Sequence, residues 1–293
     1  MKSHFDNKIL PYFLLLPSFL IIGYFLFYPT IETFRLSFYR LGPFGIRKIF
    51  IGWENFQELL LSPNYLNSMK VSFLFSIGVV CVGLSCSLAL AVLTNQKVAG
   101  MKIYRATLIW PYALSPAIAG ALFVFIFDAT SGPLNYLISV IFRVKPMWLT
   151  SSSLAIWVVI AAGAWKNIGY NIVFFLAGLQ NIPKDIQEAA DIDGANKFQV
   201  FWKITFPILS PITFFLLIMN LIYSFFGCFG LIDVMTQGGP SASTNIMIYN
   251  LYLDAFVNHK TGLAAAESIL LFLIVVILTM IQFATSGKKV HYQ

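Results

Sequence analysis

The sequence predicts an all-α integral membrane protein, with one transmembrane domain over residues 1–293 that contains six membrane-spanning helices. Hydrophobic residues make up 58% of the chain, charged residues 11%, and the mean hydropathy is +0.79. Soluble domains carry about 25% charged residues, so this chain has too little polar surface to fold in water. The few charges also leave six gaps of 20 to 29 residues. Each gap is long enough for a transmembrane helix, which needs about 20 apolar residues.

The six expected spans follow these gaps, at about 10–31, 71–95, 106–127, 151–177, 206–232 and 264–285. The fourth span continues past Lys166 because the residues up to Ala177 stay apolar. A seventh charge-free stretch, between Asp233 and Asp254, contains a run of Gly, Pro, Ser, Thr and Asn that favours turns, so it is expected as a loop. The other expected outer loops are 33–69 and 129–150, and the loop after the fifth span is 234–262. Pro111 and Pro116 lie in the third span and permit a kink there.

An even number of spans places both termini on one side of the membrane. The termini and the two loops on their side hold 10 Lys and Arg residues, against 8 on the other side. By the positive-inside rule this small excess favours cytoplasmic termini. The formal net charge of +7 suits basic flanks on anionic lipid and does not require a nucleic-acid partner.

The loop at about 178–205 contains the most informative motif. Pro183 suits the first turn of a helix, and acidic residues follow where the helix dipole is positive. Gly194 can adopt the positive φ that ends a helix, and a second helix is expected from about Asn196. A short helix in the loop would therefore present a face of small and apolar residues, made of Ile182, Ile186, Ala189 and Ala190.

The same loop resembles the EAA signature of ABC-importer permeases. The residues that carry the resemblance are Glu188, Ala189, Ala190, Asp193, Gly194, Ile204 and Pro207, with Phe206 where the family prefers Leu. The resemblance implies a cytoplasmic coupling helix that docks on an ABC ATPase, in a bacterial inner (plasma) membrane protein. The alternative is an ordinary interfacial helix.

The resemblance extends to the carbohydrate-uptake branch of the family. The loop with Gly238, Gly239 and Pro240 is similar to the segment that faces the solute-binding protein in that branch. The segment Trp165-Lys166-Asn167 with Tyr170 and Asn171 is most similar to the A-type permeases of sn-glycerol-3-phosphate importers. This resemblance implies four kinds of partner: an E-type second permease in a heterodimer, two ATPase copies, a periplasmic or lipid-anchored solute-binding protein, and membrane lipid. Permeases for sugars, oligosaccharides or glycerophosphodiesters are the alternatives within the class.

Catalytic motifs are missing from the sequence. It has no phosphate-binding loop of the G-x-x-x-x-G-K-[ST] type, and its three histidines lie apart with no metal-ligand spacing. We therefore expect a transport subunit without a cofactor, metal or catalytic residue, with ATP hydrolysis in a separate chain. An ion-coupled secondary transporter or an intramembrane enzyme are the more distant alternatives.

A charge inside a span indicates a functional position because it is costly in lipid. Lys166 lies midway through the fourth span, and a cation with polar neighbours suits a phosphate group in a pore. The candidate substrate pathway consists of Lys166, Asn167, Tyr170, Asn171, Asn220 and Tyr223. Lys166 could instead pair with a carboxylate or snorkel, and Asn220 and Tyr223 could serve as interhelical hydrogen bonds.

Overall fold

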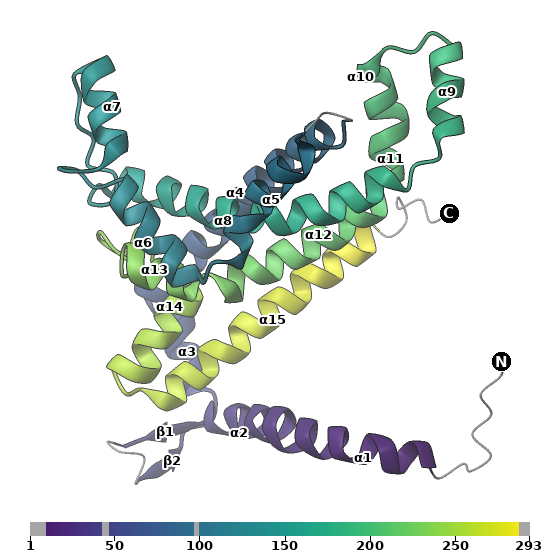
Figure 1. Ribbon diagram of the computed structural model, residues 1–293. Coiled ribbons are helices and arrows are strands. Elements are labelled where there is room, and N and C mark those ends of the chain that lie inside the picture. Colours follow the sequence, from purple (N-terminus) through teal and green to yellow (C-terminus); the bar gives the residue numbers. More distant parts are fainter. Residues whose placement is uncertain (1–9, 43–46, 97–99, 287–293) are drawn as a thin grey trace. The chain divides into compact units, whose positions relative to one another are not determined.

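The computed structural model describes residues 10–42, 47–96 and 100–286, and most of this part of the chain is helical (Figure 1). The chain divides into two compact units. The first contains Met1–Ser62 and Leu251–Leu270, and the second contains Pro63–Asn250 and Leu271–Gln293. Each unit has its own packing.

The first unit begins with a long apolar helix. Helix α1 (Leu10–Ile22), the π-helical turn η1 (Gly23–Phe27) and α2 (Tyr28–Leu36) form one 27-residue helical segment with a mean hydropathy of 2.0. Nothing in its most apolar window is buried within the chain, so its apolar side chains are available to lipid. The segment covers the expected span 10–31 and continues one turn further.

A small polar cap follows this helix in the first unit. Strands β1 (Tyr39–Leu41) and β2 (Lys48–Phe50) pair antiparallel, and helix α3 is formed by Glu54–Leu61. The π-helical turn η5 (Leu253–Val257) and the first part of α15 (Thr261–Ser286) complete the unit. The side-chain amide of Asn55 donates to the carbonyl oxygens of Ser37 and Tyr39, at 2.7 and 3.2 Å, and so joins α3 to the hairpin.

The core of the second unit is a bundle of long helices. Helix α4 (Pro63–Thr94) packs along α8 (Ser152–Gln180), and α5 (Met101–Ala113) packs on another part of α8 (Figure 1). Helix α12 (Ser210–Ile222) contacts both α4 and α8. A buried cluster joins these helices, made of Ala91, Ile172, Phe175, Leu176, Leu179, Ile182, Leu209 and Leu216.

The third expected span, 106–127, is two helices rather than one. Helix α5 ends at Ala113, α6 runs over Pro116–Ile126, and the two axes meet at 105°. Pro116 has no N–H to donate and restricts Ser115 to extended backbone, which Ser115 and Leu114 both adopt. The Ser115 hydroxyl then accepts the N–H of Ile118 and caps α6. The described residues thus contain five single helices of membrane-spanning length and composition, and this bent pair would be the sixth span.

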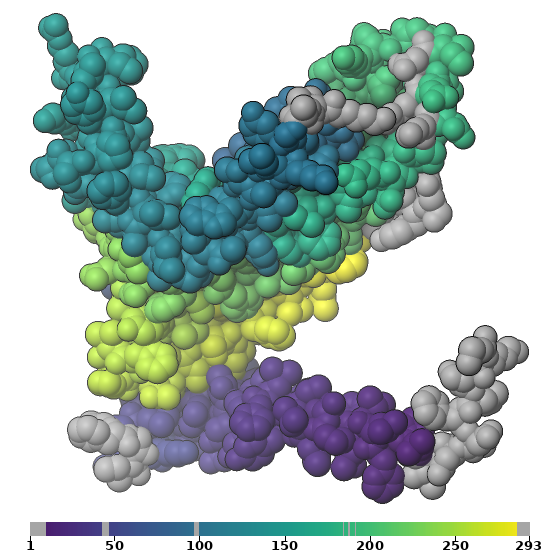
Figure 2. Space-filling view, viewed as in Figure 1, coloured from purple at the N-terminus to yellow at the C-terminus, as the bar shows by residue number. Residues whose placement is uncertain are grey.

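The remaining helices lie in the expected loops and around the fifth span. Helix α7 (Pro133–Phe142) occupies the middle of the expected loop 129–150, and α13 (Phe229–Met235) packs on α6. Prolines divide the start of the fifth span into η3 (Phe201–Thr205), α11 (Phe206–Ile208) and α12, and the turn η4 (Tyr223–Gly227) follows α12. Helix α14 (Met247–Tyr252) lies where a loop without a span was expected. Figure 2 shows α7 (teal) projecting from one end of the second unit and the segment 184–200 (green) from the other.

Candidate functional site

The loop with the EAA resemblance folds as a helical hairpin at one end of α8. Helix α9 (Lys184–Ile192) begins directly after Pro183 and has Asp185 in its first turn. Gly194 has φ +73°, which is the left-handed conformation expected at this position, and its surroundings are open. Helix α10 (Lys197–Val200) then starts at the predicted place, with Asn196 as its N-cap.

Asn196 and Gln199 form a reciprocal capping box at the start of α10. The Asn196 side chain accepts the N–H of Gln199 at 2.9 Å, and the Gln199 side chain accepts the N–H of Asn196 at 3.0 Å. A capping box satisfies two backbone N–H groups that would otherwise lack a partner at the start of a helix. The second arm of the hairpin is therefore held by its own sequence.

A shallow groove of about 460 Å³ lies between the two arms of the hairpin. Its apolar lining includes Ala189 and Ala190 from α9 and Ile204 from η3, so residues of the motif that are far apart in sequence meet here. Asp185 and Asp193 supply acidic groups to the same groove. Glu188, Ala189 and Gly194 are exposed, whereas Ala190 is buried. Pro207 is half-buried in α11, outside the groove. The small residues of this surface allow a protein partner to approach closely, and its acidic groups suit basic groups on that partner.

The candidate pathway residues form two separate groups, each centred on residues of α8. Lys166 is 6% exposed, and its Nζ lies 5.4 Å from the ring centroid of Tyr112 on α5 and 5.8 Å from that of Tyr223. The ring of Tyr170 contacts that of Tyr112 at a centroid distance of 5.3 Å, with the two planes tilted by 37°. Within the described part of the chain, Lys166 forms no ion pair. A buried ammonium group is thus surrounded by aromatic rings.

The three asparagines form a separate, self-contained group. Asn167 and Asn171 each donate to Oδ1 of Asn220, at 2.7 and 3.2 Å, and Asn220 donates back to Asn171 at 2.7 Å. Asn220 also donates to the carbonyl oxygen of Leu216. All three amides are buried. Their geometry favours the interhelical role for Asn220, because their amide groups already bond to one another across α8 and α12.

The loop with Gly238, Gly239 and Pro240 is closely packed. Gly238 has φ +77° and is buried, and the hydroxyl of the fully buried Thr244 donates to the Gly239 carbonyl oxygen at 2.7 Å. Asn67 on α4 donates to the Ala242 carbonyl oxygen at 3.0 Å. The loop therefore presents a fixed surface to any partner, with Ser241 at its exposed edge.

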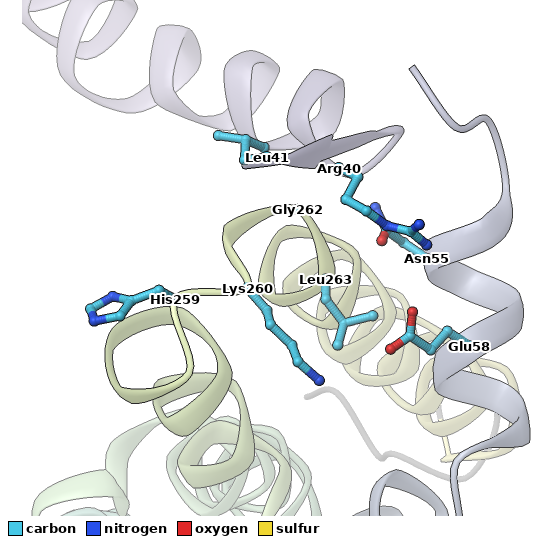
Figure 3. Close-up of a pocket in the computed structure, with 8 residues that line it drawn as sticks. All are labelled: Arg40, Leu41, Asn55, Glu58, His259, Lys260, Gly262 and Leu263. Atoms are coloured by element: carbon cyan, nitrogen blue, oxygen red, sulfur yellow. The ribbon is translucent and has the colours of Figure 1, made fainter. Parts of the chain in front are cut away.

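A polar pocket of about 330 Å³ lies within the first unit (Figure 3). Arg40 and Glu58 line one side, Lys260 faces them, and His259 points away. Arg40 is already paired with Glu54 at 3.3 Å, and the ion pair is exposed. Exposed pairs of this kind are weak. Gly262 is required at the base of the pocket because a Cβ there would collide with the Tyr39 carbonyl oxygen.

The fold is that of an integral-membrane transport subunit, with an exposed helical hairpin and a buried cation in its helical bundle. Among the described residues, no group of three His, Cys, Asp or Glu side chains could hold a metal ion. Residues 82–288 match the family described as binding-protein-dependent transport system inner membrane component, and the chain belongs to this family.

Similar curated proteins match over their full length. The sn-glycerol-3-phosphate transport system permease protein UgpA of Brucella abortus is 43% identical over 293 residues, covering 99% of each chain. The protein of the same name from Agrobacterium fabrum is 43% identical over 290 residues, covering 98% of each chain. The one from Yersinia pestis is 40% identical over 294 residues, covering 100% of this chain and 99% of the relative.

Solved structures show the same fold. A chain of a bacterial ABC transporter involved in the import of the acidic polysaccharide alginate has a TM-score of 0.84 at 22% identity, covering 95% of both chains. A chain of an amino acid ABC transporter has a TM-score of 0.54 at 11% identity, covering 80% of this chain and 97% of the other. The predicted all-α membrane fold of an ABC-importer permease is confirmed.

Tyr112 is the residue of the candidate site that the sequence does not reveal. The chain contains 13 Tyr and 29 Phe residues, so one more aromatic in an apolar stretch carries no signal of its own. Its role emerges only when α5 is packed on α8.

Proposed function

We propose that this chain is a permease subunit of an ATP-driven ABC importer and forms half of the translocation pathway for sn-glycerol-3-phosphate. The observation that carries the proposal is the full-length identity of 40–43% to permease proteins of sn-glycerol-3-phosphate transport systems. Similarity that covers both chains from end to end includes the spans, the loops and the substrate path together.

The energy for transport comes from separate chains, because this chain has no phosphate-binding loop. Two ATPase copies bind the assembly, and one of them binds the α9 hairpin of this chain. A second permease of the E type supplies the other half of the pathway. A solute-binding protein delivers the substrate on the opposite side of the membrane, at the loop that contains Gly238, Gly239 and Pro240. The hairpin and both termini then lie in the cytoplasm.

Helix α9 transmits motion from the ATPase to the spans. ATP binding brings the two ATPase copies together and displaces the docked helix. Ile182, between α8 and α9, is buried in the same cluster as Leu209 and Leu216, so the hairpin is fixed to the bundle. Its displacement therefore tilts α8 and α12 and changes which side of the membrane the pathway faces.

Lys166 supplies the positive charge for the phosphate group. It is buried in the bundle, and no carboxylate in the described residues neutralises it. An ammonium group is a compact charge with three donors, which suits a phosphate oxygen. Neutral sugars offer no such complement.

The test is uptake of labelled sn-glycerol-3-phosphate by membrane vesicles or cells that hold the complete transporter. Deletion of this chain should abolish uptake. Lys166→Met should abolish uptake in an intact complex. Gly194→Asp, which places a side chain on a left-handed residue of the docking hairpin, should assemble without coupling ATP hydrolysis to transport. Unchanged uptake without the chain would refute the substrate, and sugars and glycerophosphodiesters would then be assayed.

A further inference from the structure

The surroundings of Lys166 are unusual for a buried cation. Its Nζ faces the rings of Tyr112 and Tyr223, at 5.4 and 5.8 Å from their centroids, and both distances are within the range of a cation–π contact. No salt bridge satisfies it within residues 10–42, 47–96 and 100–286. The two rings come from different helices, so they enclose the ammonium group from two directions.

Aromatic rings offset the burial of an ammonium group without cancelling its charge. A carboxylate partner would neutralise Lys166 and would compete directly with an incoming anion. Ring faces attract the cation through their quadrupole and leave the net positive charge in place. The arrangement thus keeps a buried positive charge available to a ligand.

We propose that Tyr112 and Tyr223 are positioning residues that take the place of a counter-ion and hold the Lys166 ammonium group where it binds the phosphate group of the substrate. This inference rests on the proposed function and adds two specificity-determining residues to it. The ligand that fits this site is a phosphomonoester. It carries a charge of about −1.5 to −2 at neutral pH, so it is attracted most strongly to a cation that no carboxylate neutralises.

The position of Tyr112 is set by backbone packing. It lies near the end of α5, just before the 105° bend into α6, and is 46% exposed. A Cβ on Gly169 would lie 2.7 Å from the carbonyl oxygen of Ile109, so this glycine allows α5 to approach α8 closely. The ring is therefore held over Lys166 and is also open to an arriving ligand.

Tyr223 is positioned by a second irregular element. It is the first residue of the π-helical turn η4, which follows α12. Asn220, one turn earlier, is bonded to Asn167 and Asn171 on α8, next to Lys166. Single π-helical turns inside longer helices occur frequently at functional sites because they redirect a side chain. Both rings thus lie beside a break in a helix.

The experiment uses the complete transporter in proteoliposomes with its solute-binding protein, and measures KM and maximal rate for sn-glycerol-3-phosphate. Tyr112→Leu and Tyr223→Leu remove the ring and should each raise KM about 30-fold, the value of one desolvated cation–π contact. Tyr112→Phe and Tyr223→Phe keep the ring and should restore KM to within about threefold of the parent value. Tyr104→Leu, on the exposed face of α5, is the matched control.

The outcomes separate the inference from the function on which it rests. If Leu variants assemble and keep the parental KM, or if Phe variants are as impaired as Leu variants, the rings do not position Lys166 and the inference is wrong while the substrate stands. A lower maximal rate with unchanged KM would also contradict it, because that result indicates helix packing. If the parent complex transports a sugar and no phosphomonoester, the proposed function and the inference both fail.

Discussion

Asn220 allows the strongest test of how the bundle is held together. Its side chain takes part in three bonds to Asn167 and Asn171, at 2.7, 3.2 and 2.7 Å. Interhelical hydrogen bonds in membranes contribute about 0.6 kcal/mol each on average, so three are worth about 2 kcal/mol. Asn220→Leu would also leave two buried amides without their partner, which costs about 1–3 kcal/mol more. The expected loss of stability is therefore about 3–5 kcal/mol.

A triple variant distinguishes a structural amide cluster from a substrate path. Replacing Asn167, Asn171 and Asn220 together by Leu removes every partner at once and leaves no orphaned amide in the cluster. Such a replacement can be nearly neutral for stability. We expect the triple variant to be within about 1 kcal/mol of the parent and to retain transport if the amides only join α8 to α12.

The assay is thermal unfolding of the complex in lipid nanodiscs, followed by uptake in proteoliposomes. The single variant should unfold at a clearly lower temperature than the triple variant. Equal stability of the single variant and the parent would refute the assigned bonds. A stable triple variant that has lost uptake would show that the amides contact solute, in agreement with the sequence-based prediction for these residues.

Three further substitutions or conditions test local features. Gly262→Ala should lower the free energy of unfolding by about 1–3 kcal/mol, because the new Cβ would collide with a main-chain carbonyl group of β1. Gly23→Ala is the control, since nothing lies within 4 Å of a Cβ there. Equal effects of the two substitutions would contradict the contact at Gly262. Asn196→Ala should destabilise the first turn of α10 by about 1 kcal/mol and so speed amide hydrogen exchange in that turn. Unchanged exchange would refute the capping box. Turn N–H and hydroxyl donors lower the pKa of Asp128 well below its usual range. The stability that Asp128 contributes is therefore fully present above that range and is lost progressively as pH falls from there through the lowered pKa. Trp148 donates to Asn135, whose amide donates to the Asp128 carbonyl oxygen. Trp148 fluorescence should therefore stay constant down to about pH 4, and a transition above that pH would contradict this reasoning.

The hairpin could be predicted in detail because its determinants are local. The positive φ of Gly194 and the helix start after Asn196 depend on residues within one or two turns, and the structure has both. The groove is different, since Ile204 reaches Ala189 and Ala190 only through the fold of the hairpin. The family signature supplied that connection.

The bundle interior could be predicted only in part because its contacts are tertiary. The position of Lys166 within a span follows from the sequence, but the choice of neighbours does not. A helix places Lys166 and Tyr170 along one row and Asn167 and Asn171 along the next. The first row faces α5 and the turn η4, and the second faces α12, so a polar side that looked continuous in the sequence separates into two groups of contacts. The prolines indicated a kink in the third span, but not a bend of 105°.

The hairpin and the bundle interior are joined by helix α8, through which docking at α9 would act on the proposed substrate site at Lys166. Helix α8 carries Lys166 near its middle and ends at Gln180, about 21 Å further along its axis at 1.5 Å per residue. Ile182 follows and is buried with Leu209 of the next helical segment. A close-packed interior transmits displacement rather than absorbing it. A force on α9 would therefore move α8 and α12 together. Helix α5 packs closely on α8 at Gly169, so Tyr112 would move with Lys166 and the ring would stay over the ammonium group.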